Sequence, residues 1–268
     1  MNIKTLILMI INGLILLVIS SLSFSFFNQF SSVLNDRILM QLNSIETLET
    51  IQIQNYINNE WERFSKSDQY NTSLFNNDLA LPDSIKRING IHDFTPFHPD
   101  KKVTIGFILN TKNGRKISLL DFNQIQKILL ERTGMGLSGE TYLVGKDYRM
   151  RSESRFLSQV KPYNILAKTK GVVSALNGKD GRGIFNDYRG IPVYSVYSLI
   201  KISNLKLVIL SEIDVSEVNK PLANLKWRLI TLTLVIFMIA VIISLFLTKI
   251  IVNPIKNMQN SLRVMAKG

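Results

Sequence analysis

The residues best suited to bind a ligand form a short run of arginines and serines. Arg149, Arg151 and Arg155 lie within seven residues of one another, with Ser152 and Ser154 between them. A guanidinium binds a carboxylate or a phosphate through two parallel hydrogen bonds, and serine hydroxyls can add donors. The run therefore predicts a site for a small, anionic solute.

Four tyrosines extend this site, because a tyrosine offers a flat apolar wall with a polar tip. The predicted ligand-binding residues are Tyr142, Arg149, Arg151, Ser152, Ser154, Arg155, Tyr188, Tyr194 and Tyr197. The alternative is structural, with the arginines exposed as surface charge or paired with Glu153 or Asp187.

Catalytic chemistry has little support in this sequence. The absence of cysteine excludes disulfides and thiol catalysis, and the presence of only two histidines nearly excludes nucleophile–base pairs. The glycines at positions 134 to 145 lack the Lys-Ser/Thr ending of a phosphate-binding loop and indicate turns. His92 and His98, each near an aspartate, lie in a proline-containing loop that fixes no metal geometry. We therefore expect no enzyme activity, no cofactor and no metal.

Two apolar segments without a charged side chain bracket the chain, Thr5–Phe27 and Leu229–Thr248. A helix rises 1.5 Å per residue, so about 20 residues cross a hydrocarbon core of roughly 30 Å. The segments predict transmembrane helices at residues 5–27 and 226–248, with one domain of residues 28–225 between them. For the first segment the alternative is a signal peptide, because a basic residue precedes it and serines follow.

The charge distribution predicts the orientation in the membrane. All 20 acidic residues lie between Asp36 and Glu217, whereas the termini carry only basic residues. Basic residues near short terminal segments tend to stay in the cytoplasm. We therefore expect residues 1–4 and 249–268 in the cytoplasm and the central domain outside, in a multi-pass protein of the plasma (inner) membrane. The net charge of +12 is partly a membrane signal and requires no nucleic-acid partner.

The first part of the central domain is predicted to be one long helix. There is neither Gly nor Pro between Leu14 and Leu81, and apolar residues recur every three or four positions from Leu34 to Phe64. This period indicates a helix that ends at about Ser65. We expect its apolar stripe to be a packing face, with room for a dimer interface.

The remainder of the domain combines strands with short helices, which predicts an α+β fold. Helices are expected at Asn123–Arg132, within Lys161–Asn177, and at Asp214–Trp227, which leads into the second span. Asn113-Gly114 indicates a hairpin. The predicted strands, mostly antiparallel, are Val103–Leu109, Arg115–Leu120, Glu140–Val144, Arg182–Tyr188, Pro192–Leu199 and Lys206–Ser211.

Two stretches of the domain resemble a known family. Gly139-Glu-Thr-Tyr-Leu-Val-Gly145 with Met150-Arg-Ser-Glu-Ser-Arg-Phe156 resembles the central segment of Cache domains, the PAS-like extracellular sensors of bacterial receptors. Residues 183–197 and 207–214 resemble the closing strands of that family. The similar region covers about residues 100–222. The resemblance implies a sheet that binds a small solute on one face.

A second resemblance lies at the C-terminus. Residues 252–268 resemble the first helix of a HAMP linker, with Pro254 just past the membrane. Apolar residues spaced 4, 3, 4 and 3 from Ile251 to Met265 form a heptad pattern. This implies an incomplete HAMP linker at residues 249–268 and a parallel dimer. An amphipathic helix on anionic lipid is the alternative.

These observations predict the sensing and membrane portion of a signal-transduction receptor. Its partners would be a small-molecule solute, the membrane, a second copy of the chain, and a cytoplasmic output domain or partner protein. The resemblance implies that a full-length relative is a histidine kinase, a cyclase, a phosphatase or a chemoreceptor. Two alternatives remain, a stand-alone membrane scaffold or regulator and an anchored hydrolase.

Overall fold

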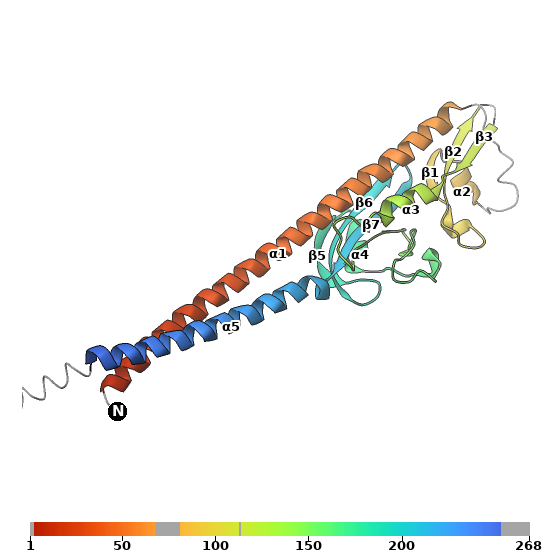
Figure 1. Ribbon diagram of the computed structural model, residues 1–268. Helices are drawn as coiled ribbons and strands as arrows, with labels where there is room; N and C mark the ends of the chain where they lie inside the picture. The colour runs from red at the N-terminus through yellow and green to blue at the C-terminus, as the bar shows by residue number, and fades with distance from the viewer. Residues whose placement is uncertain (1–2, 68–80, 113, 253–268) are drawn as a thin grey trace, which may run out of the picture. The chain divides into compact units, whose positions relative to one another are not determined.

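The structure, a computed structural model, describes residues 3–67, 81–112 and 114–252. The chain divides into two compact units, residues 36–218 and residues 1–35 together with 219–268. The first unit combines helices with antiparallel sheets, which confirms the predicted α+β class (Figure 1). The predicted HAMP segment lies outside the described residues from position 253 onward.

Two long helices contain the segments predicted to span the membrane. Helix α1 runs from Ile3 to Lys66, so the long helix predicted to end at about Ser65 is confirmed. Helix α5 runs from Val215 to Leu247 and joins the predicted exit helix to the second span without a break. A π-helical turn, η4, follows at Thr248–Val252. By length and composition, both α1 and α5 can cross a membrane.

Polar side chains connect the two helices within the apolar unit. Asn12 Nδ2 donates to Ser244 Oγ at 3.2 Å, and the hydroxyls of Ser23 and Thr233 lie 3.1 Å apart. Such hydrogen bonds favour helix pairing in lipid, where water offers no competing partner. The two apolar segments therefore form a hydrogen-bonded helix pair.

Unit 36–218 contains two antiparallel sheets. The smaller has the order β1-β2-β3, with β1 at Gly90–Asp93, β2 at Ile105–Thr111 and β3 at Gly114–Leu119. Strands β2 and β3 pair antiparallel as the predicted hairpin requires, and Asn113 of its turn lies outside the described residues. The larger has the order β4-β7-β6-β5, with β4 at Glu140–Val144, β5 at Gly181–Asn186, β6 at Pro192–Ile202 and β7 at Leu205–Asp214.

Short helices complete the unit. They are α2 at Asp83–Lys86, η2 at Thr95–Phe97, α3 at Phe122–Leu130, η3 at Pro162–Asn164 and α4 at Lys170–Leu176. Asp121 caps α3 by accepting a hydrogen bond from the Asn123 backbone. Strand β1 is absent from the predicted strands, because a four-residue strand containing His and Asp carries too little apolar pattern.

The larger sheet has a buried core on each face. On one face, Ile53 and Ile57 of α1 pack with Leu143, Ile209 and other apolar residues. On the other face, α4 and the segment after β4 cover Tyr142, Val208 and Leu210 (Figure 1). Successive residues of a strand point to opposite faces, so this sheet places alternate side chains against α1 and against α4.

The buried stripe of α1 differs from the expected apolar stripe. Between Leu42 and Ile53 the buried positions are Glu46 and Glu49, which are 4 % and 5 % exposed. Leu48, which the apolar period places on the packing face, is 60 % exposed. The sheet therefore selects a face of α1 that is rotated from the one predicted, and it buries two carboxyl groups.

Candidate functional site

Arg151 lies at the centre of the candidate site, with its side chain only 1 % exposed. Its Nε donates to Asp93 Oδ2 at 2.9 Å, and Nη2 donates to Asp147 Oδ1 at 2.9 Å. Nη1 donates to the Arg149 carbonyl, also at 2.9 Å. Two carboxylates thus neutralise the buried guanidinium, as such a charge requires. Arg151 thereby joins the end of β1 to the turn after β4.

The turn after β4 is shaped around this guanidinium. A side chain at Gly145 would collide with Nη1, Nη2 and Cζ of Arg151. The Gly145 backbone N–H donates to the Arg149 carbonyl at 2.9 Å, and Tyr148 adopts a left-handed φ of 61°. Gly145, which has no side chain, thus leaves the space that the Arg151 guanidinium fills.

Two clefts open beside Arg151. The first, about 390 Å³, is named the lysine cleft and is lined by Asp100, Lys101, Lys102, Val103, Phe122, Asn123, Gln126, Arg151, Glu153, Lys161 and Pro162. The second, about 350 Å³, is named the histidine cleft and is lined by Ile85, Ile88, His92, Asp93, Pro96, Phe97, Lys146, Asp147, Arg151, Asn204 and Lys206. Arg151 is the one predicted site residue that lines both.

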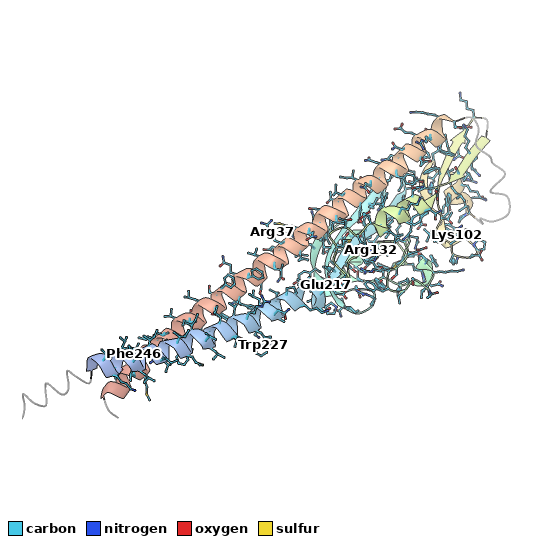
Figure 2. All side chains as sticks on the ribbon, in the orientation of Figure 1. Arg37, Lys102, Arg132, Glu217, Trp227 and Phe246 are labelled. Atoms are coloured by element: carbon cyan, nitrogen blue, oxygen red, sulfur yellow. The ribbon has the colours of Figure 1, made fainter. Side chains whose placement is uncertain are left out.

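The lysine cleft carries more positive than negative side chains. Lys102 and Lys161 are exposed, and neither has an ion pair among the described residues (Lys102 is labelled in Figure 2). Lys101 Nζ donates to the Pro96 carbonyl at 2.7 Å. Asp100 and Glu153 are the acidic residues of the lining. With Arg151 held by two aspartates, the three lysines are the cations that remain to meet a ligand.

The aromatic ring of Tyr163 gathers three cations near this cleft. The guanidinium carbons of Arg149 and Arg151 lie 5.1 Å and 5.3 Å from the ring centroid, and Lys101 Nζ lies 5.7 Å from it. Arg149 also donates to the Tyr163 carbonyl at 3.0 Å. A ring face attracts cations at such distances. Tyr163 therefore helps to hold the wall of the lysine cleft, although no motif in the sequence distinguishes it.

A buried carboxyl network lies on the sheet face that α4 covers. Glu212 accepts hydrogen bonds from Tyr142 Oη at 3.0 Å and Ser195 Oγ at 2.7 Å. Glu140, its cross-strand partner, accepts one from Tyr188 Oη at 2.7 Å. Every carboxyl oxygen of the network has a hydrogen-bond donor, because the Arg155 backbone N–H donates to the second oxygen of Glu140 at 2.6 Å.

Burial dominates the protonation of this network. It raises the pKa of Glu212 to about 8, although two hydroxyl donors oppose it. Burial also raises the pKa of Glu140, against the hydrogen bond from Tyr188. The pKa values of Tyr142 and Tyr188 are raised by burial and by these acids. Within this network, Glu212 therefore holds its proton at neutral pH.

The arginine that pairs with Asp187 is not one of the predicted three. Arg189 Nε donates to Asp187 at 2.6 Å and Nη2 to Asp214 at 2.6 Å. Its guanidinium also stacks on Phe156, 3.7 Å from the ring centroid. Arg155 instead donates to the Gly139 carbonyl at 2.9 Å. The short Arg–Ser run is thus fixed by backbone carbonyls, aspartates and rings.

The structure distributes the nine predicted residues among different places. Tyr142, Ser154, Arg155 and Tyr188 meet in the carboxyl network, where Ser154 Oγ lies 2.6 Å from Tyr188 Oη. Tyr197 shares that sheet face and packs on Phe185.

The other predicted residues lie elsewhere. Arg149 and Arg151 lie at the clefts, and Ser152 Oγ accepts a hydrogen bond from the Leu143 backbone at 2.9 Å. Tyr194 is buried and points to the opposite face from Tyr197, because the two differ by an odd number of positions in β6. The predicted set therefore does not line one pocket.

The histidine–aspartate loop does not assemble a metal site. His92 Nε2 lies 2.9 Å from the Ile88 carbonyl, and Asp93 is bound to Arg151. His98 Nδ1 accepts a hydrogen bond from the Asp100 backbone at 3.2 Å. In the described part of the chain, no three His, Cys, Asp or Glu side chains gather as ligands.

No protein-family profile matches the sequence, and no curated protein matches it. Several solved structures are similar to the chain, and chemoreceptor sensor domains are among them. The periplasmic sensory domain of the Campylobacter jejuni chemoreceptor Tlp1 is 15 % identical, with 74 % of this chain and 94 % of that chain covered and a TM-score of 0.44.

The ligand-binding domain of the Pseudomonas aeruginosa amino acid chemoreceptor PctC, solved with GABA, is 11 % identical. The similarity covers 66 % of this chain and 99 % of that chain, with a TM-score of 0.43. The ligand-binding domain of the Pseudomonas fluorescens chemoreceptor CtaA, solved with L-isoleucine, is also 11 % identical. The similarity covers 73 % of this chain and 98 % of that chain, with a TM-score of 0.38. At such values these structures indicate no ligand for this chain.

Proposed function

We propose that this chain is the sensing and membrane portion of a signal-transduction receptor. The observation that carries the proposal is the combination of a folded α+β unit with two helices apolar enough to cross a membrane, one on each side of it in the sequence. The sensor, residues 28–225, would lie outside the plasma (inner) membrane. A reporter fused at Lys146 should be active outside and one at Gly268 inside; the reverse pattern would exclude this topology.

The ligand we propose is a small, anionic solute in the lysine cleft. A volume of about 390 Å³ suits a small molecule, and Lys101, Lys102 and Lys161 supply cations around it. Phe122 and Pro162 offer apolar surface beside those charges. Arg151 shapes the cleft wall, while the lysines recognise the charge.

The signal would leave the cleft through α3. Phe122, Asn123 and Gln126 of α3 line the cleft. The loop after α3 is bound to the start of α5, because Glu217 accepts hydrogen bonds from the Leu137 and Ser138 backbone N–H groups, both at 2.7 Å. A solute that binds one arrangement of α3 more tightly would shift the population of arrangements. Helix α5 would carry that shift to a HAMP-linked output domain or partner.

The receptor is proposed to act as a homodimer. Leu48 and Ile51 are exposed apolar residues on one stretch of α1 and would suit contact with a second copy. Cysteine at Leu48 should form an intermolecular disulfide in membranes, because the chain has no other cysteine. A matched cysteine at Glu62, near the end of the helix, should give less cross-linking. Equal, low cross-linking at both positions would count against the α1 contact.

A thermal-shift screen tests the ligand. The full chain in lipid nanodiscs would be heated with carboxylates and phosphates of small size, because a ligand that binds only the folded state raises the melting temperature. We expect the double variant Lys102→Ala/Lys161→Ala to lose the response to the active solute. Lys179→Ala, an exposed lysine away from the cleft, should retain it. An unchanged response in the double variant would exclude this cleft.

A further inference from the structure

The α1 helix buries two acids against the larger sheet. Glu46 and Glu49 occupy consecutive turns of the buried stripe that also contains Leu42, Ile53 and Ile57. An ionised carboxylate is costly to bury without a partner. Their position in a helix–sheet interface therefore requires an explanation.

The two carboxyls are not equally satisfied. Glu46 accepts hydrogen bonds from the Ser198 hydroxyl of β6 and from Thr50 Oγ1 at 3.3 Å. Neither oxygen of Glu49 has a hydrogen-bond partner among the described residues. The Thr141 hydroxyl lies 2.9 Å from Ser211 Oγ; it also faces Glu49 and opposes the rise in the pKa of that acid without meeting hydrogen-bond geometry. Buried polar groups of native proteins are nearly always paired, so Glu49 is an exception that indicates a neutral, protonated acid.

The charges that face these carboxyls are themselves acidic. Glu46 and Glu131 act on Glu49, and Asp180 acts on Glu46. Neither carboxyl has an ion pair with a lysine or arginine in the part of the chain that the structure describes. Burial is the main cause that raises the pKa of Glu49 to about 8, and it also raises the pKa of Glu46. The proton on Glu49 is therefore lost close to physiological pH.

We propose that Glu49 is a proton-sensing site of this receptor. While the carboxyl is protonated, α1 packs against the sheet; once it ionises, the unpaired charge loosens this interface. Because α1 is the helix that also contains the first span, a change in its packing is an input to the membrane. This input is separate from the solute cleft, so the variant Lys102→Ala/Lys161→Ala should retain it.

The first test follows thermal stability of the full chain in lipid nanodiscs between pH 5 and pH 9. A carboxyl whose pKa is raised on folding stabilises the folded state least at high pH. Relative to wild type, Glu49→Gln should therefore gain roughly 5–10 °C in melting temperature on going from pH 5 to pH 9. Glu62→Gln, on the exposed surface of the same helix, should follow wild type at every pH.

The comparison uses the change with pH, so a constant loss from burying an amide does not obscure it. Glu49→Leu provides a second variant without any polar group and should show the same flattened profile. If both variants keep the pH dependence of wild type, the proposal is wrong.

The second test asks whether the interface itself responds. The chain has no cysteine, so spin labels can be placed at Gln52 on α1 and Lys201 on β6, both exposed. We expect the distance between the labels to lengthen or broaden from pH 6 to pH 9 in the otherwise wild-type chain, and to stay constant with Glu49→Gln. A distance that is constant in both, or that changes equally in both, would overturn proton sensing at Glu49.

Discussion

Glu140 and Glu212 are direct cross-strand partners on β4 and β7, and each carboxyl accepts a hydrogen bond from a tyrosine hydroxyl. Like charges directly opposite each other destabilise a sheet. Burial raises the pKa of both acids, for Glu212 to about 8, so Glu212 is neutral at pH 7 and the repulsion is avoided. Hydrogen bonds at Glu140 join the segments around residues 140, 154 and 188, and the pairing of β4 with β7 places Glu212 beside them.

Replacing Glu212 by Gln should flatten the pH dependence of stability. The pKa of Glu212 rises on folding from 4.5 to about 8, so its contribution is fully present below pH 4.5 and is lost as pH rises to about 8. We expect wild type to lose stability over this window and the variant to lose about 3–5 kcal/mol less of it. Melting curves at pH 5, 7 and 9 measure the difference; parallel curves would show that Glu212 is ionised in the fold.

Removing the tyrosine donor should have the opposite effect. Tyr142→Phe leaves one Glu212 oxygen unpaired and should cost about 1–3 kcal/mol of stability. The cost should grow with pH, because the ionised carboxylate needs the donor most. Tyr56→Phe, whose hydroxyl donates to an exposed carbonyl, is a matched control and should cost less. Equal costs for the two variants would argue that the network adds nothing at Tyr142.

Much of the fold follows from local pattern. The run without Gly or Pro predicts α1, and the alternating residues predict β4 with its observed bounds, Glu140–Val144. Other strands differ from their predicted bounds by a few residues, and α4 occupies only the last part of its predicted region. These elements can be predicted because the pattern of apolar and polar residues that defines them extends over only a few neighbouring positions.

The site depends on contacts between distant parts of the chain. Because Arg151 is an arginine, it is expected to bind carboxylates. One of the carboxylates that it binds, Asp93, lies 58 positions away in the sequence, so local pattern could not identify this partner. An acid in a helix is ordinarily expected on the exposed side, and only the tertiary packing of α1 buries Glu49. Residue type indicates the chemistry, while the fold determines which group meets which.

Arg151→Met should destabilise the sensor unit. The change leaves Asp93 and Asp147 without their cation, and breaking such a buried pair costs about 3–5 kcal/mol. Adding Asp93→Asn and Asp147→Asn should restore part of the loss, because the uncompensated charges are then removed. Melting of the single and triple variants checks this; a triple variant no more stable than the single one would contradict the ion-pair account.

Gly145→Ala should also destabilise the unit, by about 1–3 kcal/mol, because the added methyl meets the Arg151 guanidinium. Gly183→Ala is the matched control, since a methyl there would lie 4.0 Å from its nearest neighbour, the Phe185 ring. The same substitution in the Arg151→Met background should cost less than in wild type, because the shorter, more flexible side chain can yield. An equal cost in both backgrounds would place the strain in the backbone and not at Arg151.

Glu217→Gln should weaken the connection between the sensor and α5. Glu217 accepts hydrogen bonds from the Leu137 and Ser138 backbone N–H groups, and a hydrogen bond to a carboxylate contributes about 1.5–3 kcal/mol. The glutamine amide nitrogen cannot accept a hydrogen bond, so one of these bonds is lost. The loop lies close to α5 at this point, because Gly136 has a left-handed φ of 67° and a side chain at Gly136 would collide with Glu217 Oε1. Solute binding in the lysine cleft should persist in this variant, while the response of α5 to the solute, followed by a spin label at exposed Lys220, should decrease. Lys220 mobility that responds as strongly as in wild type would show that the signal leaves the sensor by another route.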